Sequence, residues 1–355
     1  MQNVNSKVAP LNEEAMKASK EHWDHIGKPI EGLGLLEEMI IKVAGIQETE
    51  KVDLGKKAVV VMCADNGVVE EGVTQTGAEV TAIVTENFGK RIASVNIMAQ
   101  LAGAVVFPVD IGVKTDIRQE GVLNCKVAYG TKNMKKEPAM SKEETLKAIQ
   151  KGFEMVQALK EEGYKIIGTG EMGIGNTTTS SAVLSVLLDA PVRDVTGYGA
   201  GLSNEGLLHK IAVIEKAIEV NQPNREDPID VLSKVGGLDI AGLTGVFLGG
   251  AALKIPIVID GVISMAAALL AKRIEPNAVL YMLPSHLGKE PASQLAMKEL
   301  GLNPIIHGNL ALGEGTGTTL LFPMLDLAMG VYNQNKTFTD IHVDEYHKYT
   351  DNKEI

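Results

Sequence analysis

The stretch IIGTGEMGIGNTTTSS, residues 166–181, decides how the rest of the chain is interpreted. Residues 164–167 are typical of a short apolar strand, and the glycines that follow predict a turn. Asn176 and the three threonines after it mark the start of a helix. Glycine lets backbone N–H groups approach an anion closely, and the unpaired N–H groups of a helix N-terminus add positive potential. The stretch is therefore either a phosphate-binding loop or a plain tight turn.

Glu171 lies inside this glycine-rich stretch. A carboxylate beside a bound phosphate is unfavourable unless it has a task of its own, so Glu171 is a candidate functional residue. The spacing of the glycines matches neither the G-x-G-x-x-G dinucleotide fingerprint nor a P-loop, which needs Gly-Lys-Ser/Thr. The stretch thus predicts an anion site of another kind.

Composition excludes several classes of partner. The 355 residues are 45% hydrophobic and 22% charged, enough for one large or two ordinary folded domains. A net charge of −11 and only 4% aromatic residues argue against nucleic-acid binding, which needs clustered Lys and Arg or stacking platforms. A phosphate on a small molecule stays compatible, since a few amides and one lysine can bind it.

The chain also lacks targeting and redox signals. Its N-terminus has no basic segment followed by an apolar core, and no run approaches the roughly 20 apolar residues of a membrane span. The two cysteines, Cys63 and Cys125, have no metal-ligand spacing and cannot form a disulfide framework. We expect a cytoplasmic protein that has no membrane partner.

Apolar runs alternate with helical patterns along most of the chain, which predicts an α/β fold with a doubly wound, mostly parallel, Rossmann-like sheet. Strands are expected at residues 58–64, 104–112, 164–167, 256–261 and 278–283, with an ambiguous extended segment near 125–128. One helix is expected from residue 78 to residue 103. The helical patterns at both chain ends fall outside the alternation. We therefore expect a small helical domain of residues 1–50 and 320–355, and a large catalytic α/β domain of residues 51–319.

Acidic residues stand at the ends of four expected strands. A single such residue is usually a helix cap or a turn residue. The carboxyl ends of parallel strands share one edge, where ligands collect, so the set predicts at least one ligand contact. The four residues are Asp65, Asp110, Glu171 and Asp260.

The second decisive stretch is GNLALGEGTGTT, residues 308–319. Glu314 is flanked there by Gly313 and Gly315, which allow the backbone to present its side chain into a cleft. A surface loop is the alternative. Poor solvation among glycines and apolar residues would raise the pKa of Glu314 toward the range of a general base. Glu314 and Glu171 could then divide the work at one electrophilic carbon.

Two basic residues are weaker candidates. Lys210 follows the glycine-rich loop at residues 197–204 and is either a phosphate ligand or a solvated helix lysine. His286 stands beside Ser285, but without a G-x-S-x-G elbow a hydrolase triad is not supported. No H-E-x-x-H or C-x-x-C motif occurs, so neither a metal nor another cofactor is expected.

Four segments together resemble one family, and they run in order over about residues 29–338. They are ADNGVVEEGV (64–73), GEMGIGNTTTSSAV (170–183), GGLDIAGLTG (236–245) and LGEGTGTTLLFPMLD (312–326). They are similar to nicotinate-nucleotide:dimethylbenzimidazole phosphoribosyltransferases, which make the lower nucleotide loop of cobalamin. The resemblance implies a homodimer that moves 5-phosphoribosyl from nicotinate mononucleotide to a benzimidazole nitrogen. The products would be α-ribazole 5′-phosphate, inverted at C1′, and nicotinate, and no metal would take part.

The resemblance also implies roles for residues. Glu314 matches the general base, and Glu171 matches a second family glutamate that stabilises charge on the ribose or positions a water. The matching phosphate and nucleotide contacts are Gly173, Ile174, Gly175, Asn176, Thr177, Thr178, Lys210, Gly315 and Thr316. The matching base-binding residues are Thr76, Val84, Met172 and Leu312.

Three positions depart from the family pattern: Asn66 replaces a common histidine, Ala311 a common arginine and Val84 a common glutamine. They predict a more apolar base pocket that accepts altered benzimidazoles. Two other functions are compatible with the motifs: a glycosidic-bond phosphorylase or hydrolase, and a non-catalytic sensor of ribose phosphates.

Overall fold

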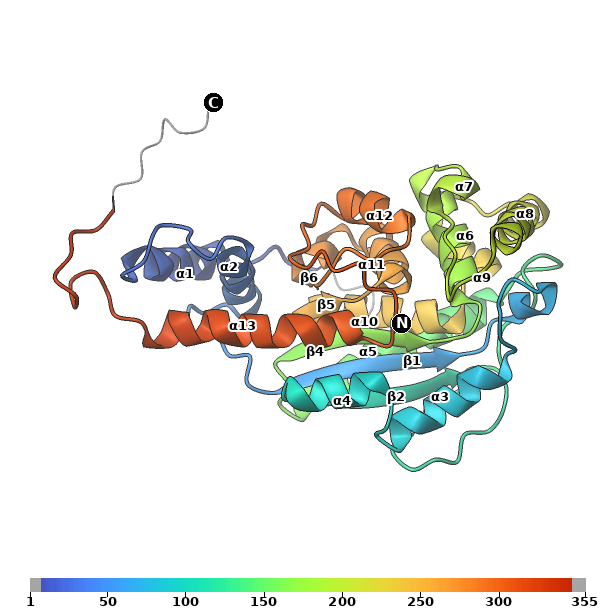
Figure 1. Cartoon of the computed structure of the whole chain (residues 1–355), viewed down its shortest axis with the longest axis horizontal. Coiled ribbons are helices and arrows are strands. Elements are labelled where there is room, and N and C mark those ends of the chain that lie inside the picture. The colour runs from blue at the N-terminus through green and yellow to red at the C-terminus, as the bar shows by residue number, and fades with distance from the viewer. Residues whose placement is uncertain (1–7, 347–355) are drawn as a thin grey trace.

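A computed structural model of the chain describes residues 8–346, and its centre is one six-stranded parallel sheet. The strand order is β3-β2-β1-β4-β5-β6, so the order reverses between β1 and β4 (Figure 1). The strands are β1 (Lys57–Ala64), β2 (Ala104–Gly112), β3 (Leu123–Asn124), β4 (Ile166–Met172), β5 (Ile257–Ile259) and β6 (Met282–Pro284). The predicted doubly wound α/β fold is confirmed.

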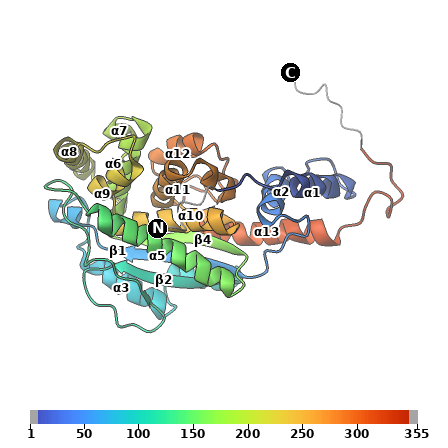
Figure 2. The same ribbon diagram turned by 180° about the vertical axis from the view of Figure 1, so that it is seen from behind.

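Helices cover both faces of the sheet (Figures 1 and 2). Val60 and Met62 of β1 pack in the core on the side of α5, α10 and α11, whereas Val59, Val61 and Cys63 pack on the side of α2, α4 and α13. All of β1 is therefore buried, which explains its continuous apolar sequence. The helices are α1 (Glu13–His25), α2 (Leu35–Gln47), α3 (Glu79–Gly89), α4 (Ser94–Leu101), α5 (Lys142–Glu161), α6 (Asn176–Leu188), α7 (Val192–Val195), α8 (Asn204–Asn221), α9 (Pro228–Val235), α10 (Leu238–Leu253), α11 (Val262–Ile274), α12 (Ala292–Leu300) and α13 (Thr316–Gln334).

Two expected elements outside β4 were wrong, and one ambiguous segment is defined by the structure. The helix expected over residues 78–103 is two helices, α3 and α4, because the chain turns at Arg91 with a φ of 61°. The first part of the strand expected at 278–283 belongs to a 3-10 helix, Pro276–Tyr281. The ambiguous segment near 125–128 follows the short strand β3, although Cys125 N and Val127 N still donate to backbone oxygens of β2.

The largest correction concerns β4. It continues through Gly168 and Gly170 to Met172, so the expected turn begins only at Gly173. A Cβ atom on Gly168 would lie 2.8 Å from Thr318 Cβ, and one on Gly170 would overlap the carbonyl oxygen of Glu314. These two glycines therefore permit the start of α13 to lie directly on the strand.

Helix α13 connects the sheet with the N-terminal helices α1 and α2 (Figure 1). It begins beside β4 and ends against α1 and α2, where the rings of Trp23 and Tyr332 are 4.9 Å apart. Beyond it, Thr337 pairs with Ile26 in an antiparallel bridge. The helices of both ends thus pack together, while the division at residues 50 and 320 stays a prediction.

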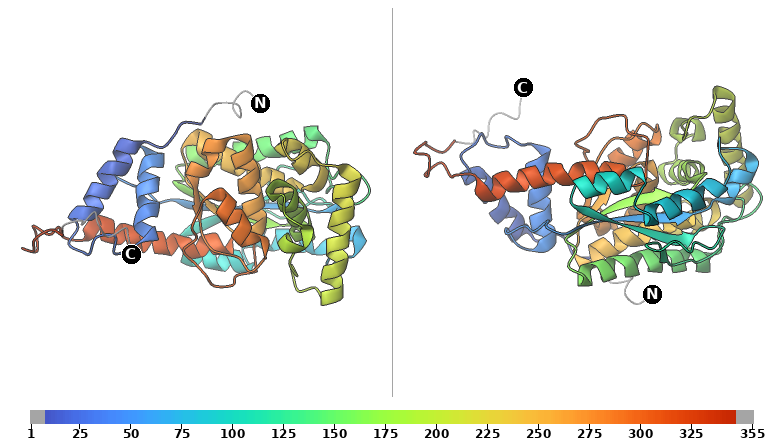
Figure 3. Two further views of the ribbon diagram at one scale, coloured as in Figure 1. Left: turned by 90° about the horizontal axis from the view of Figure 1, so that it is seen from above. Right: turned by 60° about the horizontal axis from the view of Figure 1, so that its bottom comes forward.

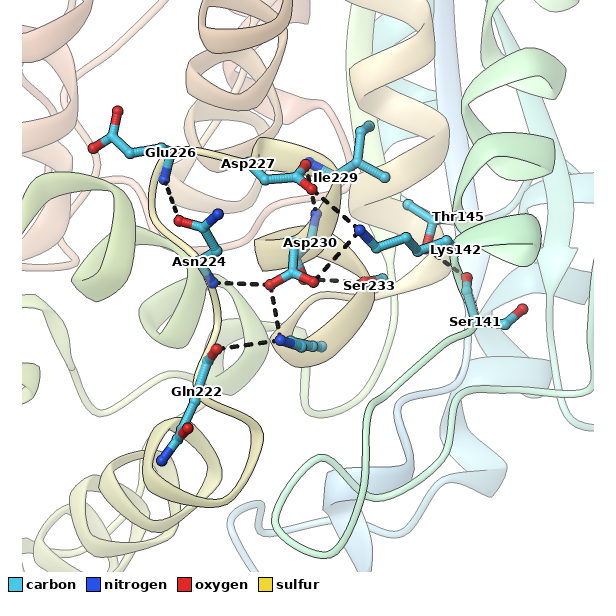
Figure 4. Close-up of polar contacts among 11 residues, drawn as sticks. Ser141, Lys142, Thr145, Gln222, Asn224, Glu226, Asp227, Ile229, Asp230 and Ser233 are labelled. Carbon is cyan, nitrogen blue, oxygen red and sulfur yellow. Dashed lines mark hydrogen bonds and ion pairs between the residues drawn. The ribbon is translucent and has the colours of Figure 1, made fainter.

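A polar network holds the starts of α5 and α9 together (Figure 4). Ser141 and Glu144 form the capping box typical of a helix start, and Asp227 caps α9. Lys142 of α5 bridges Asp227, at 3.1 Å, and Asp230, at 3.6 Å. Within residues 8–346, no helix is both long and apolar enough to cross a bilayer.

Candidate active site

A cavity of about 240 Å³ opens at the carboxyl edge of the sheet. The end of β4 and the start of α6 form one wall, and the loop at residues 197–202 with Lys210 forms another. Residues 260–264, 286–293 and 310–314 close the other sides. Both decisive sequence stretches therefore meet at one place.

Glu171 and Glu314 line the same cavity. A Cβ atom on Gly313 would overlap Oε1 of Glu171, so the loop that carries Glu314 lies directly on the Glu171 carboxyl group. The negative charge of Glu314 is also one of the influences that raise the pKa of Glu171. The two carboxyl groups are thus close enough to act on one ligand.

Glu171 is buried within a small acidic network. Asn176 donates through Nδ2 both to Glu171 Oε2 and, at 3.0 Å, to Asp239 Oδ2. Burial raises the pKa of Glu171 from 4.5 to about 8; the Asn176 hydrogen bond opposes this rise, and the charges of Asp239, Asp260 and Glu314 add to it. Glu171 therefore holds its proton at neutral pH.

This raised pKa predicts how stability depends on pH. Between pH 4.5 and about 8 the unfolded chain has lost the Glu171 proton and the folded chain keeps it, so the free energy of unfolding falls as pH rises through this window. Glu171→Gln has no proton to lose. We expect the difference between the Tm of this variant and the Tm of the wild type, measured by calorimetry, to increase by roughly 2 °C or more between pH 5 and pH 8. The exposed Glu143→Gln is the control, and a Tm difference that is constant with pH would contradict the assignment.

Glu314 is held by its backbone and by a second helix. Its φ of 62° is rare for a residue other than glycine, and its Oε2 accepts a hydrogen bond of 3.4 Å from Val95 N at the start of α4. Burial raises the pKa of Glu314; the Val95 hydrogen bond opposes the rise and the charge of Asp260 adds to it. A carboxylate in this setting is a stronger base than one in water.

Asp260 shapes the loop after Glu314. Its two oxygens accept hydrogen bonds from Gly315 N, at 3.1 Å, and Gly317 N, at 2.8 Å. It thus supplies the N-terminal cap that α13 lacks, because Gly315 has no side chain. Asp260 fixes where α13 starts and so positions Glu314.

Lys210 lines the cavity from the side of α8. Its Nζ is buried and donates to Thr177 Oγ1 at 2.9 Å and to Gly197 O at 3.3 Å. Burial lowers the pKa of Lys210 from 10.5 to about 8, while Glu290 opposes the shift. The alternative of a solvated helix lysine is wrong, and this ammonium beside the start of α6 forms a compact anion cradle.

The other predicted site residues divide into two groups. Those that line the cavity are Gly173, Ile174, Gly175, Asn176, Thr177, Thr76, Met172 and Leu312. Those placed outside its lining are Thr178, Gly315, Thr316 and Val84. Gly315 N donates to Asp260, Thr316 Oγ1 donates to Gly313 O, and Val84 is a partly buried side chain that packs against the core. The roles given to all of these residues stay predictions.

The acidic strand ends also divide. Asp65 accepts a hydrogen bond from Lys114 N at 2.7 Å, and Asp110 forms an ion pair with Lys126 at 2.9 Å, so both acids stabilise loops. The other two, Glu171 and Asp260, line the cavity. Sequence reasoning missed Asp239, which the GGLD stretch before α10 could have indicated. In the described part of the chain, no group of three or more His, Cys, Asp or Glu side chains is placed to hold a metal ion.

Comparisons with known proteins identify the family of this chain. A family model described as phosphoribosyltransferase matches residues 8–343. The nicotinate-nucleotide--dimethylbenzimidazole phosphoribosyltransferase of Clostridium acetobutylicum is 46% identical over 346 residues, 98% of each chain. The protein of the same name from Ruminiclostridium cellulolyticum is 47% identical over 97% of each chain. The crystal structure of CobT from Thermus thermophilus superposes with a TM-score of 0.89 at 36% identity, covering 94% of this chain and 100% of that one. The chain therefore belongs to the nicotinate-nucleotide--dimethylbenzimidazole phosphoribosyltransferase family.

Proposed function

We propose that the protein transfers the 5-phosphoribosyl group of nicotinate mononucleotide to 5,6-dimethylbenzimidazole or a related base. The products would be α-ribazole 5′-phosphate and nicotinate, for assembly of a cobamide nucleotide loop. The observation that carries the proposal is a pair of carboxyl groups, Glu171 and Glu314, in one cavity with the cradle formed by Lys210 and the start of α6. The names of the relatives support the choice of substrates.

The chemistry divides between two parts of the cavity. The cradle binds the 5′-phosphate, and C1′ then lies near the carboxyl groups. As one benzimidazole nitrogen attacks C1′, the other N–H proton passes to Glu314, while the pyridinium of the nucleotide leaves as neutral nicotinate ring nitrogen. Attack from the face opposite the leaving group inverts C1′. A pyridinium near Glu171 favours the ionised form of that carboxyl group, which then stabilises positive charge on the ribose.

Product analysis tests the reaction. The purified protein is incubated with nicotinate mononucleotide and each of several bases, and products are identified by mass and anomeric configuration. An α-nucleotide that forms only when the base is present supports the proposal. Release of nicotinate at the same rate without a base would identify a hydrolase, and binding without turnover would identify a sensor.

The part of the cavity proposed to bind the benzimidazole base is largely apolar. We therefore expect the protein to accept several bases. Thr76, Met172, Ala311 and Leu312 form this part of its lining, and a methylene or methyl group alters binding in such a pocket by only about 1–3 kcal/mol. In an equimolar competition we expect dimethylbenzimidazole, benzimidazole and 5-methoxybenzimidazole all to react, with rates measured by mass spectrometry. Adenine serves as the polar comparison. Use of dimethylbenzimidazole alone would contradict this prediction.

We also propose a homodimer, on the basis of an apolar patch on α4 and α13, which lie side by side (Figure 3). Leu101 is 85% exposed and Leu327 73%. Ile97 and Leu320 are also exposed, and their spacing of four and seven residues puts each on the same helix face as its neighbour. Contiguous exposed apolar residues on a folded protein mark association sites. Light scattering should give a dimer for the wild type and a monomer for Leu327→Glu, with Glu143→Gln as control. A wild-type monomer would contradict the proposal.

We propose a cytoplasmic location for this reaction. Both Cys63 and Cys125 are free thiols, as is usual in a reducing compartment. Fractionation of cells that express the full chain would test it, and recovery of the protein outside the cytoplasm would contradict it.

A further inference from the structure

His286 lines the cavity at the end that holds the carboxyl groups, beside Asp260. It follows β6, is only 4% exposed, and lies close enough to Asp260 for the charge of that residue to influence its pKa. Four residues later Glu290 accepts a hydrogen bond from Gly199 N, at 3.1 Å, beside Lys210. The segment from His286 to Glu290 therefore runs from the carboxyl end of the cavity to the lysine end.

The neighbours of His286 define which ring nitrogen carries a proton. Ser285 Oγ lies 2.6 Å from Ile259 O, and because a carbonyl oxygen can only accept, the hydroxyl proton is donated there. Ser285 Oγ is also 2.9 Å from His286 Nδ1, and with its own proton committed it must accept from Nδ1–H. Burial lowers the pKa of His286, against the opposing charge of Asp260, and so favours the neutral ring. Nε2 of the neutral ring therefore carries a lone pair and is an acceptor.

Nε2 faces the cavity. It would lie 3.7 Å from a Cβ atom on Gly288 and 4.0 Å from one on Gly261, and both of these glycines line the cavity. Among residues 8–346 the hydrogen bond of the His286 ring is made by Nδ1, and no donor reaches Nε2. Nε2 is not one of the fully buried side-chain atoms that lack a partner, so it is open to the cavity and free to accept from a ligand donor. A hydrogen bond of this kind contributes about 0.5–1.5 kcal/mol.

We propose that Nε2 of His286 accepts a hydrogen bond from a ribose hydroxyl of the nucleotide and so selects ribonucleotides over deoxyribonucleotides. The inference rests on the proposed function. A nucleotide whose phosphate lies at Lys210 and whose C1′ lies at Glu171 and Glu314 has its 2′-carbon, next to C1′, near the carboxyl end of the cavity. His286 lies at that end. The only hydrogen-bond donors on that ring are the 2′- and 3′-hydroxyl groups. His286 is thus a specificity residue, separate from the residues that perform the transfer.

The test compares kcat/KM for nicotinate mononucleotide with kcat/KM for its 2′-deoxy and 3′-deoxy analogues, in the wild type and three variants. His286→Gln places an amide oxygen near the position of Nε2, whereas His286→Asn reaches only the position of Nδ1 and His286→Phe has no polar atom. We expect the wild type to discriminate against one analogue by about 10-fold or more through this contact. The discrimination should fall by about that factor in His286→Asn and His286→Phe and be partly restored in His286→Gln. The intrinsic reactivity of each analogue is the same for every variant and cancels in the comparison.

The outcomes separate this inference from the proposed function. Absence of transfer by the wild type from nicotinate mononucleotide would contradict the proposed function. Transfer by the wild type with an unchanged ribose-to-deoxyribose ratio in all three variants would overturn the role of His286. A loss of rate that is equal for every substrate would mean that His286 only supports the fold, and would also overturn it.

Discussion

Replacing Glu314 by glutamine is expected to lower kcat for base transfer by about 10²- to 10⁴-fold, the usual contribution of a general base. Glutamine has nearly the same shape, and its amide oxygen can still accept the hydrogen bond from Val95 N that holds Glu314 Oε2. The positive φ of residue 314 is no more strained for glutamine than for glutamate. The loss therefore reports the proton acceptor and not a displaced loop.

The pH dependence of the rate gives a second test of the same residue. Burial raises the pKa of Glu314 above 4.5, and the base works only when ionised, so the wild-type rate should fall as pH decreases through that pKa. Glu314→Gln should lack this acid limb. Glu143→Gln, at an exposed position of α5, is the control for a lost carboxylate. Wild-type activity in Glu314→Gln would exclude Glu314 as the general base and would mean that another group accepts the proton.

Lys210→Met is the second change with a large expected effect, and it should raise KM for nicotinate mononucleotide. The buried ammonium group is the charge in the cradle, and hydrogen bonds to charged groups contribute about 1.5–3 kcal/mol, which is roughly 10- to 150-fold in kcat/KM. Because burial lowers the pKa of Lys210 from 10.5 to about 8, its charge destabilises the fold relative to the unfolded chain, although the side chain stays mostly protonated at neutral pH. Methionine should therefore leave Tm unchanged or raise it, so that a kinetic loss is not caused by unfolding.

Nicotinate riboside, which lacks the phosphate, is the control substrate for Lys210→Met. The wild type should prefer the mononucleotide strongly, and the variant should lose most of that preference. Lys216→Met, an exposed position in the same helix, should keep it. If Lys210→Met retained the full preference, the phosphate would have to bind elsewhere in the cavity.

Local sequence patterns were enough to predict several strands and helices of the fold. The continuous apolar run of β1 predicted a strand because a strand buried on both faces needs apolar residues at every position. The apolar run of β2 predicted a strand as well, although only its second half is fully buried. The Ser141 and Glu144 spacing located the start of α5 for the same kind of local reason. The two glycine-rich stretches identified Glu171 and Glu314, since glycines around a carboxylate are visible in sequence.

The spatial proximity of the two glycine-rich stretches depends on the tertiary structure. Gly168 and Gly170 belong to a strand, and the start of α13 lies directly on them. This contact joins residues about 150 positions apart, so no local sequence pattern could predict it. The same holds for Asp260, a strand-end acid whose function as the cap of α13 arises only when β5 and α13 meet. Val84 and Thr316 were matched by motif, and the structure places both outside the lining of the cavity, so their roles stay predictions.

Sequence alone determined the class of sheet, the family resemblance and the two candidate carboxylates, because apolar periodicity and glycine placement are local properties. Only the tertiary structure decided which acids face one cavity, why Glu171 keeps its proton and which nitrogen of His286 is free. These properties depend on burial and on hydrogen-bond partners from distant segments. The physical reason is that desolvation and charge act through space, and the chain must fold before they act.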